Sequence, residues 1–315
     1  MYLQGRFWWS KRTKEGFDNA LRLLDQAVQI DPTFALAHTG IADTYSLLPL
    51  QGFLAPREAL LKAREAANRA LQLDDQLAEA HCSIGMVRFY LEWDLKGGEQ
   101  DFQRAMKLNP RYATAHQWYA LNAGIQGRIS EARTELLRAI ELDPLAPIFF
   151  HNLGWVAYWE RDWNGMLSRM RGGLEFAPEF PLLYQGAGLA LLELGQADDA
   201  LSHLRKATGF APSSSLAAST LGYGLARTGH EQEARTLLAE WLELTKTRYV
   251  PPSDIAMIYV GLGELDLAFE WLEKGIEVRD TWMAFLGVLP QWEPLRSDPR
   301  YASLLRRVGL PTQEK

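Results

Sequence analysis

The chain has 315 residues, a formal net charge of −6 at pH 7 and a single cysteine, Cys82. One cysteine excludes an internal disulfide and a cysteine-based zinc site, and an acidic chain without a dense Lys/Arg run is not expected to bind DNA or RNA directly. The N-terminus has no basic stretch followed by an apolar run, and no long uninterrupted apolar stretch follows. We therefore predict neither a signal peptide nor a membrane span, and a cytoplasmic location.

A repeat with a fixed period runs through the chain. Pro110, Pro144, Pro178 and Pro212 are 34 residues apart. A slot that is mostly alanine keeps the same spacing from Gly98 to Ala268. A period of 34 is typical of helix–turn–helix arrays, in which each repeat packs on its neighbours.

Each repeat is predicted to contain two helices. In the middle repeat, apolar residues recur at three and four spacing over 147–159 and 163–176, which predicts one helix in each range. The turn between the two helices needs a residue that adopts the left-handed conformation cheaply, and glycine does so best. The middle repeat has Arg161 in this turn. The glycines in the equivalent turns are Gly127, Gly195, Gly229 and Gly263.

The repeat resembles the tetratricopeptide repeat, whose pattern is W-x2-L-G-x2-Y…A-x3-F…P. The first half appears as His38-x2-Ile41-Ala42-x2-Tyr45, and the second as Ala132-x3-Leu136…Pro144. The resemblance implies an all-α, right-handed α-solenoid of about eight repeats over residues 1–280, the first with an irregular first helix. The tryptophan slot holds other residues, mostly bulky, namely His38, His81, His116, Phe150, Tyr184 and Ala218.

A narrower resemblance concerns stretches such as WDLKGGEQDFQRAMKLNPRYATAHQWYA at 93–120. It is similar to the C-terminal repeat region of bacterial multidomain regulators, in which the repeats follow a winged-helix, protein-kinase or nucleotide-cyclase domain. Since this chain opens directly in a predicted helix at Tyr2, it is either a fragment or a stand-alone relative. The resemblance implies a sensory or regulatory role.

Three segments depart from the period. Nine extra residues within 48–56 form either a loop folded onto its own repeat or a docking tip for another protein. The junction at 245–252 is longer than the others, which predicts a looser joint.

The segment 281–315 is predicted to cap the last repeat. Its final helix begins after Asp298, has Pro299 in its first turn and ends at Gly309. The alternative is a separate partner-binding helix.

Candidate chemistry is sparse. His38, His81 and His116 occupy one repeat slot, but equivalent slots of stacked helices lie about 8–10 Å apart, too far for one metal ion. The sequence has no nucleophile elbow, phosphate loop or H-E-x-x-H motif. We therefore predict no catalytic, metal or cofactor-binding residues, and a chain that is not an enzyme.

The first helices carry a second apolar and aromatic stripe. Trp155, Tyr158 and Trp159 share one helix face at i, i+3 and i+4. The stripe either packs between repeats or lines a concave, peptide-binding groove, as the resemblance implies for the first helices. The predicted groove residues are Met86, Phe89, Tyr90, Gln117, Leu121, His151, Trp155, Tyr158, Trp159, Gln185, Leu189 and Tyr223.

Chaperone-tail-binding members of the family that this chain resembles hold a C-terminal carboxylate with Lys and Asn on their first helices. A clamp of that kind is not expected here, because the matching positions of this chain hold no lysine. They are Thr39, Cys82, Gln117, Asp43 and Met86.

The function predicted from these features is a non-catalytic scaffold that binds a protein or a peptide segment in its groove. The alternatives are a self-assembling module, which would use Phe7, Trp8 and Trp9 and the 48–56 loop, and an enzyme whose site lies on the groove.

Overall fold

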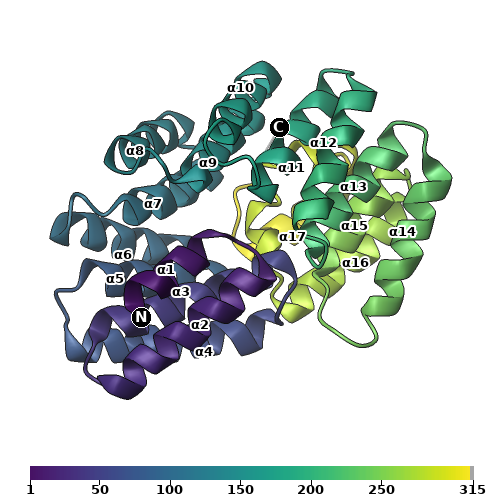
Figure 1. The fold of residues 1–315 in the computed structure, drawn as a ribbon. Helices are drawn as coiled ribbons and strands as arrows, with labels where there is room; N and C mark the ends of the chain where they lie inside the picture. The colour runs from purple at the N-terminus through teal and green to yellow at the C-terminus, as the bar shows by residue number, and fades with distance from the viewer. Residues whose placement is uncertain (313–315) are drawn as a thin grey trace. The chain divides into compact units, whose positions relative to one another are not determined.

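The structure is a computed structural model that describes residues 1–312, and every regular element in that range is helical. Eight helix pairs follow one another along the chain (Figure 1), which confirms the predicted α-solenoid repeats. The first helices of the pairs are α1 (Tyr2–Ser10), α3 (Ala35–Leu47), α5 (Ala78–Val87), α7 (Ala113–Ile125), α9 (Pro147–Trp159), α11 (Pro181–Glu193), α13 (Ser215–Arg227) and α15 (Pro252–Gly261). The second helices are α2 (Lys14–Ile30), α4 (Pro56–Leu73), α6 (Leu95–Leu108), α8 (Ile129–Leu142), α10 (Trp163–Leu174), α12 (Ala197–Phe210), α14 (Glu231–Leu244) and α16 (Leu265–Val278).

Five further elements complete the described chain. A π-helical turn, η2 (Arg88–Glu92), extends α5, and α1 is short, as expected for an irregular first helix. The remaining elements are the 3₁₀ helices η1 (Pro49–Gln51), η3 (Thr281–Phe285) and η4 (Pro290–Leu295), and the last helix, α17 (Pro299–Val308).

The helices form two compact units. Unit 1 comprises Met1–Pro49 and Pro56–Ala146, and unit 2 comprises Leu50–Ala55 and the chain from Pro147 onward. In unit 2, α13 packs against α14 and α15, and α15 packs against α16, so these helices lie side by side (Figure 1). The predicted looser joint at 245–252, between α14 and α15, stays a prediction.

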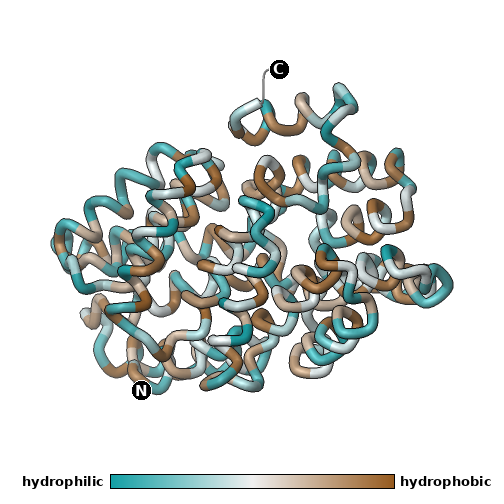
Figure 2. The backbone as a smooth tube through the Cα atoms, turned by 90° about the horizontal axis from the view of Figure 1, so that it is seen from above, coloured by the Kyte–Doolittle hydropathy of each residue, from teal (hydrophilic) through white to brown (hydrophobic). Residues whose placement is uncertain are grey.

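The two helices of a pair differ in how much of their surface is covered. Helix α11 is buried on nearly every side, whereas α12 buries mainly one stripe: Ala200, Leu201, Leu204 and Ala207. A helix that is apolar all round belongs in an interior, and an amphipathic one belongs at a surface. The hydropathy alternates along the helices accordingly, and many turns are hydrophilic (Figure 2). First helices therefore form the inner layer of the repeats.

The turns within pairs adopt the predicted left-handed conformation. Gly127, Gly195, Gly229 and Gly263 have φ between +74° and +85°. Arg161 takes the same conformation at φ +63° in the middle repeat, although it carries a Cβ. The sequence prediction of this turn is confirmed.

The histidine slot has a structural role at the junctions between repeats. The Nε2 atoms of His38, His81 and His116 lie 3.0–3.1 Å from the backbone carbonyl oxygens of Pro32, Asp75 and Pro110, each six residues earlier. A carbonyl accepts, so Nε2 donates and carries the proton. Within residues 1–312, no group of three or more His, Cys, Asp or Glu side chains is placed to hold a metal ion.

The insertion lies in unit 2, and the expectation that it folds onto its own repeat is wrong. The Ser214 hydroxyl donates to Gln51 Oε1 at 2.9 Å, and Trp282 Nε1 donates to the Leu50 carbonyl at 2.9 Å. Leu50 is buried. The apolar and polar groups of the insertion thus find their partners on residues far away in sequence, which local pattern does not reveal.

The C-terminal helix forms as predicted. The Asp298 side chain accepts from Arg300 N at 2.9 Å, and Gly309 ends α17 in the left-handed conformation at φ +78°. The apolar stripe of α17 is buried, and the helix packs on α16. A solenoid needs such a cover over its last repeat.

The close approach of neighbouring helices gives a test of the packing. A Cβ at Gly188 in α11 would lie 2.6 Å from Leu204 Cδ2, whereas a Cβ at Gly209 in α12 would meet nothing within 4 Å. We expect Gly188→Ala to lower the free energy of unfolding by about 1–3 kcal/mol, because the packed core must shift. The matched Gly209→Ala should raise it by roughly 0.5–1 kcal/mol. Urea unfolding measures both, and equal effects would contradict the packing.

Candidate functional site

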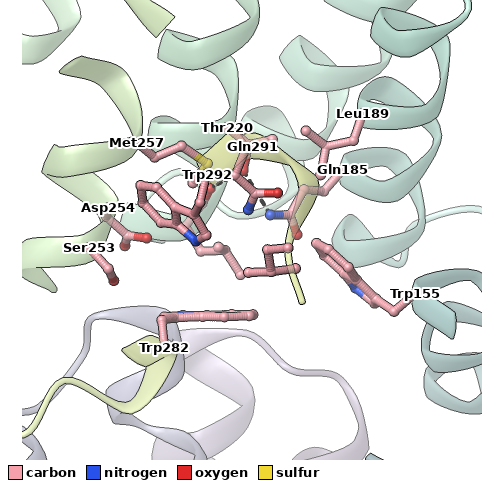
Figure 3. Close-up of a pocket in the computed structure, with 12 residues that line it drawn as sticks. Trp155, Gln185, Leu189, Thr220, Ser253, Asp254, Met257, Trp282, Gln291 and Trp292 are labelled. Carbon is pink, nitrogen blue, oxygen red and sulfur yellow. Dashed lines mark hydrogen bonds between the residues drawn. The ribbon is translucent and has the colours of Figure 1, made fainter. Parts of the chain in front are cut away.

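The inner face of unit 2 carries a small cavity. The cavity is partly open to its surroundings, and its volume is about 20 Å³, enough for about one water molecule. One wall comes from the first helices α9, α11, α13 and α15, and the other from the segment after the last repeat (Figure 3). The lining residues are Trp155, Gln185, Leu189, Leu216, Thr220, Ser253, Asp254, Met257, Trp282, Leu289, Gln291 and Trp292.

The helical wall follows from the repeat. Trp155, Leu189 and Met257 are spaced by multiples of 34 residues, as are Gln185 and Ser253. Equivalent positions of stacked helices share one face, so the repeat brings these side chains together. The Gln185 amide donates to Thr220 Oγ1 at 2.8 Å, which fixes its orientation on this wall (Figure 3).

The opposite wall is the covering segment, which we define as Thr281–Leu295. The residue before it is Asp280, whose carboxylate accepts from Ser253 N at 2.8 Å and from Trp282 N at 3.0 Å. That one side chain therefore ties the start of α15 to the start of the segment. Trp282 and Trp292 lie on opposite sides of the cavity, with Trp155 at one end (Figure 3).

Asp254 is the ionisable group in the cavity wall. The residue is 2% exposed, and its Oδ2 has no hydrogen-bond partner. Burial, together with the charge of Asp280, raises the pKa of its carboxyl to about 8, although hydrogen bonds from the hydroxyls of Ser215 and Ser219 oppose the rise. Among the described residues, no Lys or Arg offsets this effect. The carboxyl is therefore largely protonated at neutral pH.

Other polar atoms of the wall also lack partners. They are Gln291 Oε1, Ser253 Oγ and Trp292 Nε1, all of them buried. A buried polar group without a hydrogen bond costs about 1–3 kcal/mol. The cavity thus combines a mainly apolar wall with a few unpaired polar atoms, as ligand pockets do.

The structure buries the predicted groove residues rather than exposing them. All except the half-buried Trp159 are buried. Trp155, Gln185 and Leu189 line the cavity. His151, Tyr158, Trp159 and Tyr223 also belong to unit 2 but do not line it, and the other five belong to unit 1. A solvent-facing aromatic row is therefore absent from residues 1–312 as they are folded here.

The aromatic stripe of α9 packs largely on itself. Trp155 Nε1 donates to His151 Nε2 at 2.6 Å. The rings of Trp155 and Tyr158 meet edge to face at 5.3 Å, and Tyr158 meets Trp163 at 5.2 Å. Such contacts between aromatic rings add to the stability that burial provides. The stripe is thus part of the core of unit 2 and, at Trp155, also part of the cavity wall.

Unit 1 has a charged cluster on its first helices. The Arg6 guanidinium pairs with Asp43 at 2.7 Å, and the Ser83 hydroxyl donates to the other oxygen of Asp43 at 2.6 Å. Arg12 is 4% exposed and stacks on Trp9 at 3.8 Å. Burial, together with the charge of Arg6, lowers the pKa of Arg12 to about 9, although Asp43 and Tyr90 oppose the fall.

Of the charged residues in this cluster, the sequence prediction named only Asp43, as a position without the lysine of a carboxylate clamp, and it included neither arginine. Arg6 belongs to the short first helix, and Arg12 lies in the turn after it, where the repeat pattern is weakest.

Comparisons with known proteins agree with the fold. Residues 254–281 match the family model described as "Tetratricopeptide repeat". The chain is similar to the transcriptional regulator HilA of Salmonella typhimurium, with 26% identity over 160 residues. It is similar to the protein O-mannosyl-transferase TMTC3 of Homo sapiens, with 26% identity over 166 residues. Among solved structures, a chain of the APC/C hetero-tetramer Cut9–Hcn1 is similar in fold, with a TM-score of 0.62 and 15% identity. The match covers 93% of the present chain and 52% of that chain.

The matches to the two curated relatives are partial. They cover 50% of this chain and 29% of HilA, and 52% of this chain and 17% of TMTC3. None of the helices within residues 1–312 has the length and apolar content that crossing a membrane requires.

The protonation of Asp254 gives a test of the cavity. An acid whose pKa is higher in the folded than in the unfolded state keeps its proton while the unfolded chain releases one, so stability falls as pH rises from about 4 to 8. We expect Asp254→Asn to remove this fall and to be more stable than wild type at pH 8.5 by roughly 3 kcal/mol or more. Urea midpoints across this pH range measure it. Asp199→Asn, at an exposed position of α12, is the control, and a pH dependence unchanged by Asp254→Asn would contradict the assignment.

Truncation of Trp155 tests the role of the stripe. The indole is 6% exposed and donates to His151, so we expect Trp155→Ala to lower the free energy of unfolding by about 3–5 kcal/mol. Thermal unfolding followed by circular dichroism measures the loss. A melting temperature equal to that of the wild type would instead mean that the ring packs loosely and is free to contact a partner.

Proposed function

We propose that this chain, which is a tetratricopeptide-repeat protein, is a non-catalytic scaffold that binds a peptide segment of another protein on the inner face of unit 2. The fold supports protein interaction in general. The covering segment is the observation that supports peptide binding on this face. It is an irregular stretch of chain that the face already holds, with its tryptophan side chains lining the cavity.

The chemistry of the face suits a segment rather than a reactive substrate. It offers large apolar side chains, Leu189, Met257 and Trp155, with the amide of Gln185 and the hydroxyl of Thr220 between them. Aromatic and aliphatic anchors give most of the binding free energy of a peptide, and a few polar groups fix its position. The hydroxyls of the cavity wall would need a base to act as nucleophiles, and the carboxyl of Asp254, the ionisable group of the wall, is largely protonated at neutral pH.

A regulatory setting is the second part of the proposal. The similarity to HilA, a transcriptional regulator, covers half of this chain, and repeats that bind a segment change curvature easily because each contacts only its neighbours. In such a setting the repeats act as the sensory part of a larger regulator. A cytoplasmic location and self-association stay predictions.

Selection of binding peptides tests the scaffold function without a known partner. The full chain is immobilised and random peptides displayed on phage are selected against it. We expect selected peptides to lose at least about fivefold in affinity when Met257→Ala removes an inner-face anchor, because truncating such an anchor costs more than about 1 kcal/mol.

Lys206→Ala, at an exposed position of the second helix α12, is the matched control and should leave the affinity unchanged. Circular dichroism confirms that both variants are folded. Peptides that bind equally well to the Met257→Ala chain would overturn the proposal for this face.

A further inference from the structure

The inner face of unit 2 carries a buried acidic group that the folded chain leaves without a neighbouring cation. Asp254 Oδ2 lines the cavity without a hydrogen bond. The groups around this carboxyl are the hydroxyls of Ser215 and Ser219 on α13 and the carboxylate of Asp280. The buried phenol of Tyr249 also lies within the field of both acids. None of these groups is a cation.

The two neighbouring acids, Asp254 and Asp280, differ in the hydrogen bonds that they receive. Asp280 receives two backbone N–H donors, from Ser253 and Trp282. These bonds give Asp280 a structural role, since they join α15 to the covering segment. Asp254 has no such structural task at Oδ2, and an asparagine there would fill the same space without the cost of burying an acid. An unpartnered acid in a cavity wall points to a ligand that supplies the missing positive charge.

The aromatic side chains of the cavity wall would also attract a cation. Trp155, Trp282 and Trp292 surround the cavity on three sides (Figure 3). The faces of indole rings attract ammonium and guanidinium groups, most strongly where water is excluded. The covering segment places neutral side chains here, among them Leu289 and Gln291, and the Gln291 Oε1 atom also has no partner.

The size of the cavity decides how a cation arrives. At about 20 Å³ it has no room for an amino-acid side chain while the covering segment is in place. The segment is two short 3₁₀ helices, η3 and η4, joined by irregular chain, and it contains Pro290 and Pro294. Short helices of this kind have few backbone hydrogen bonds of their own, so exchanging the segment breaks few of them.

Building on the scaffold function proposed above, we propose that a partner segment takes the place of the covering segment on this face and that one of its lysine or arginine side chains pairs with the carboxylate of Asp254. The partner therefore combines apolar or aromatic anchors, as the covering segment does, with a basic residue that the covering segment lacks at the cavity.

Synthetic peptides test the exchange and the charge preference together. The parent peptide has the sequence of residues 281–295, TWMAFLGVLPQWEPL. Three further peptides carry lysine in place of Leu289, Gln291 or Trp292, the positions of the second half of the segment that line the cavity. Fluorescence anisotropy at pH 8.5 measures their binding to the full chain and to full-length Trp282→Ala, whose segment loses the hydrogen bond from the indole to Leu50.

We expect the peptides to bind Trp282→Ala more tightly than wild type, and at least one lysine peptide to bind about tenfold more tightly than the parent. That gain should disappear in Asp254→Asn and persist in Asp199→Asn. The gain should also grow as pH rises from 6 to 8, because Asp254 must lose its proton before it pairs with a cation. If Trp282→Ala does not fold, the affinities of the parent and lysine peptides are compared on the wild-type chain at millimolar peptide concentration.

The outcomes separate the two proposals. Binding of the parent and lysine peptides with equal affinity, or a lysine gain that survives in Asp254→Asn, overturns recognition through Asp254 while leaving a segment-binding face intact. Failure of every peptide to bind either chain at millimolar concentration overturns the exchange. The scaffold function itself fails separately, if phage-selected peptides ignore Met257→Ala.

Discussion

The structure depends on one constraint, which is that an inner helix with apolar residues on all sides must be covered on all sides. Within each unit, a first helix packs against its own second helix and against helices of neighbouring repeats of that unit. The small residues of the repeat make this possible, because a Cβ at Gly188 would already meet Leu204. The last repeats have no further repeat to cover them, so the chain needs another element there.

Unit 2 meets this need with segments from outside the repeat. Helix α17 packs on α16, the covering segment lies over the inner face, and the insertion at Leu50–Ala55 binds Trp282 and Ser214. Burial of the tryptophan side chains provides the stability. The polar atoms around them are satisfied only in part, and Asp254 and Gln291 retain unpaired oxygens. The inner face of unit 2, which the covering segment buries, is thus also the face where some polar atoms still lack hydrogen-bond partners.

Most of the fold was predictable because its signals are local and repeated. The 34-residue period set the helix pairs, the left-handed turns formed at the expected glycines and at Arg161, and α17 begins and ends where Asp298 and Gly309 indicate. Part of the cavity wall was within reach as well, since extending the spacing of Trp155 and Leu189 leads to Met257, and that of Gln185 leads to Ser253.

The sequence by itself determined the repeat, the helix pairs, the turns within pairs and part of one wall of the cavity, because a fixed period places equivalent residues on one face. Only the tertiary structure decided that the aromatic stripe is buried, that residues 281–295 form the second wall, and that the insertion lies in unit 2. Those contacts join residues up to 232 positions apart. Hydrophobic burial is non-directional, so an apolar segment outside the repeat does not reveal in its sequence which surface it covers.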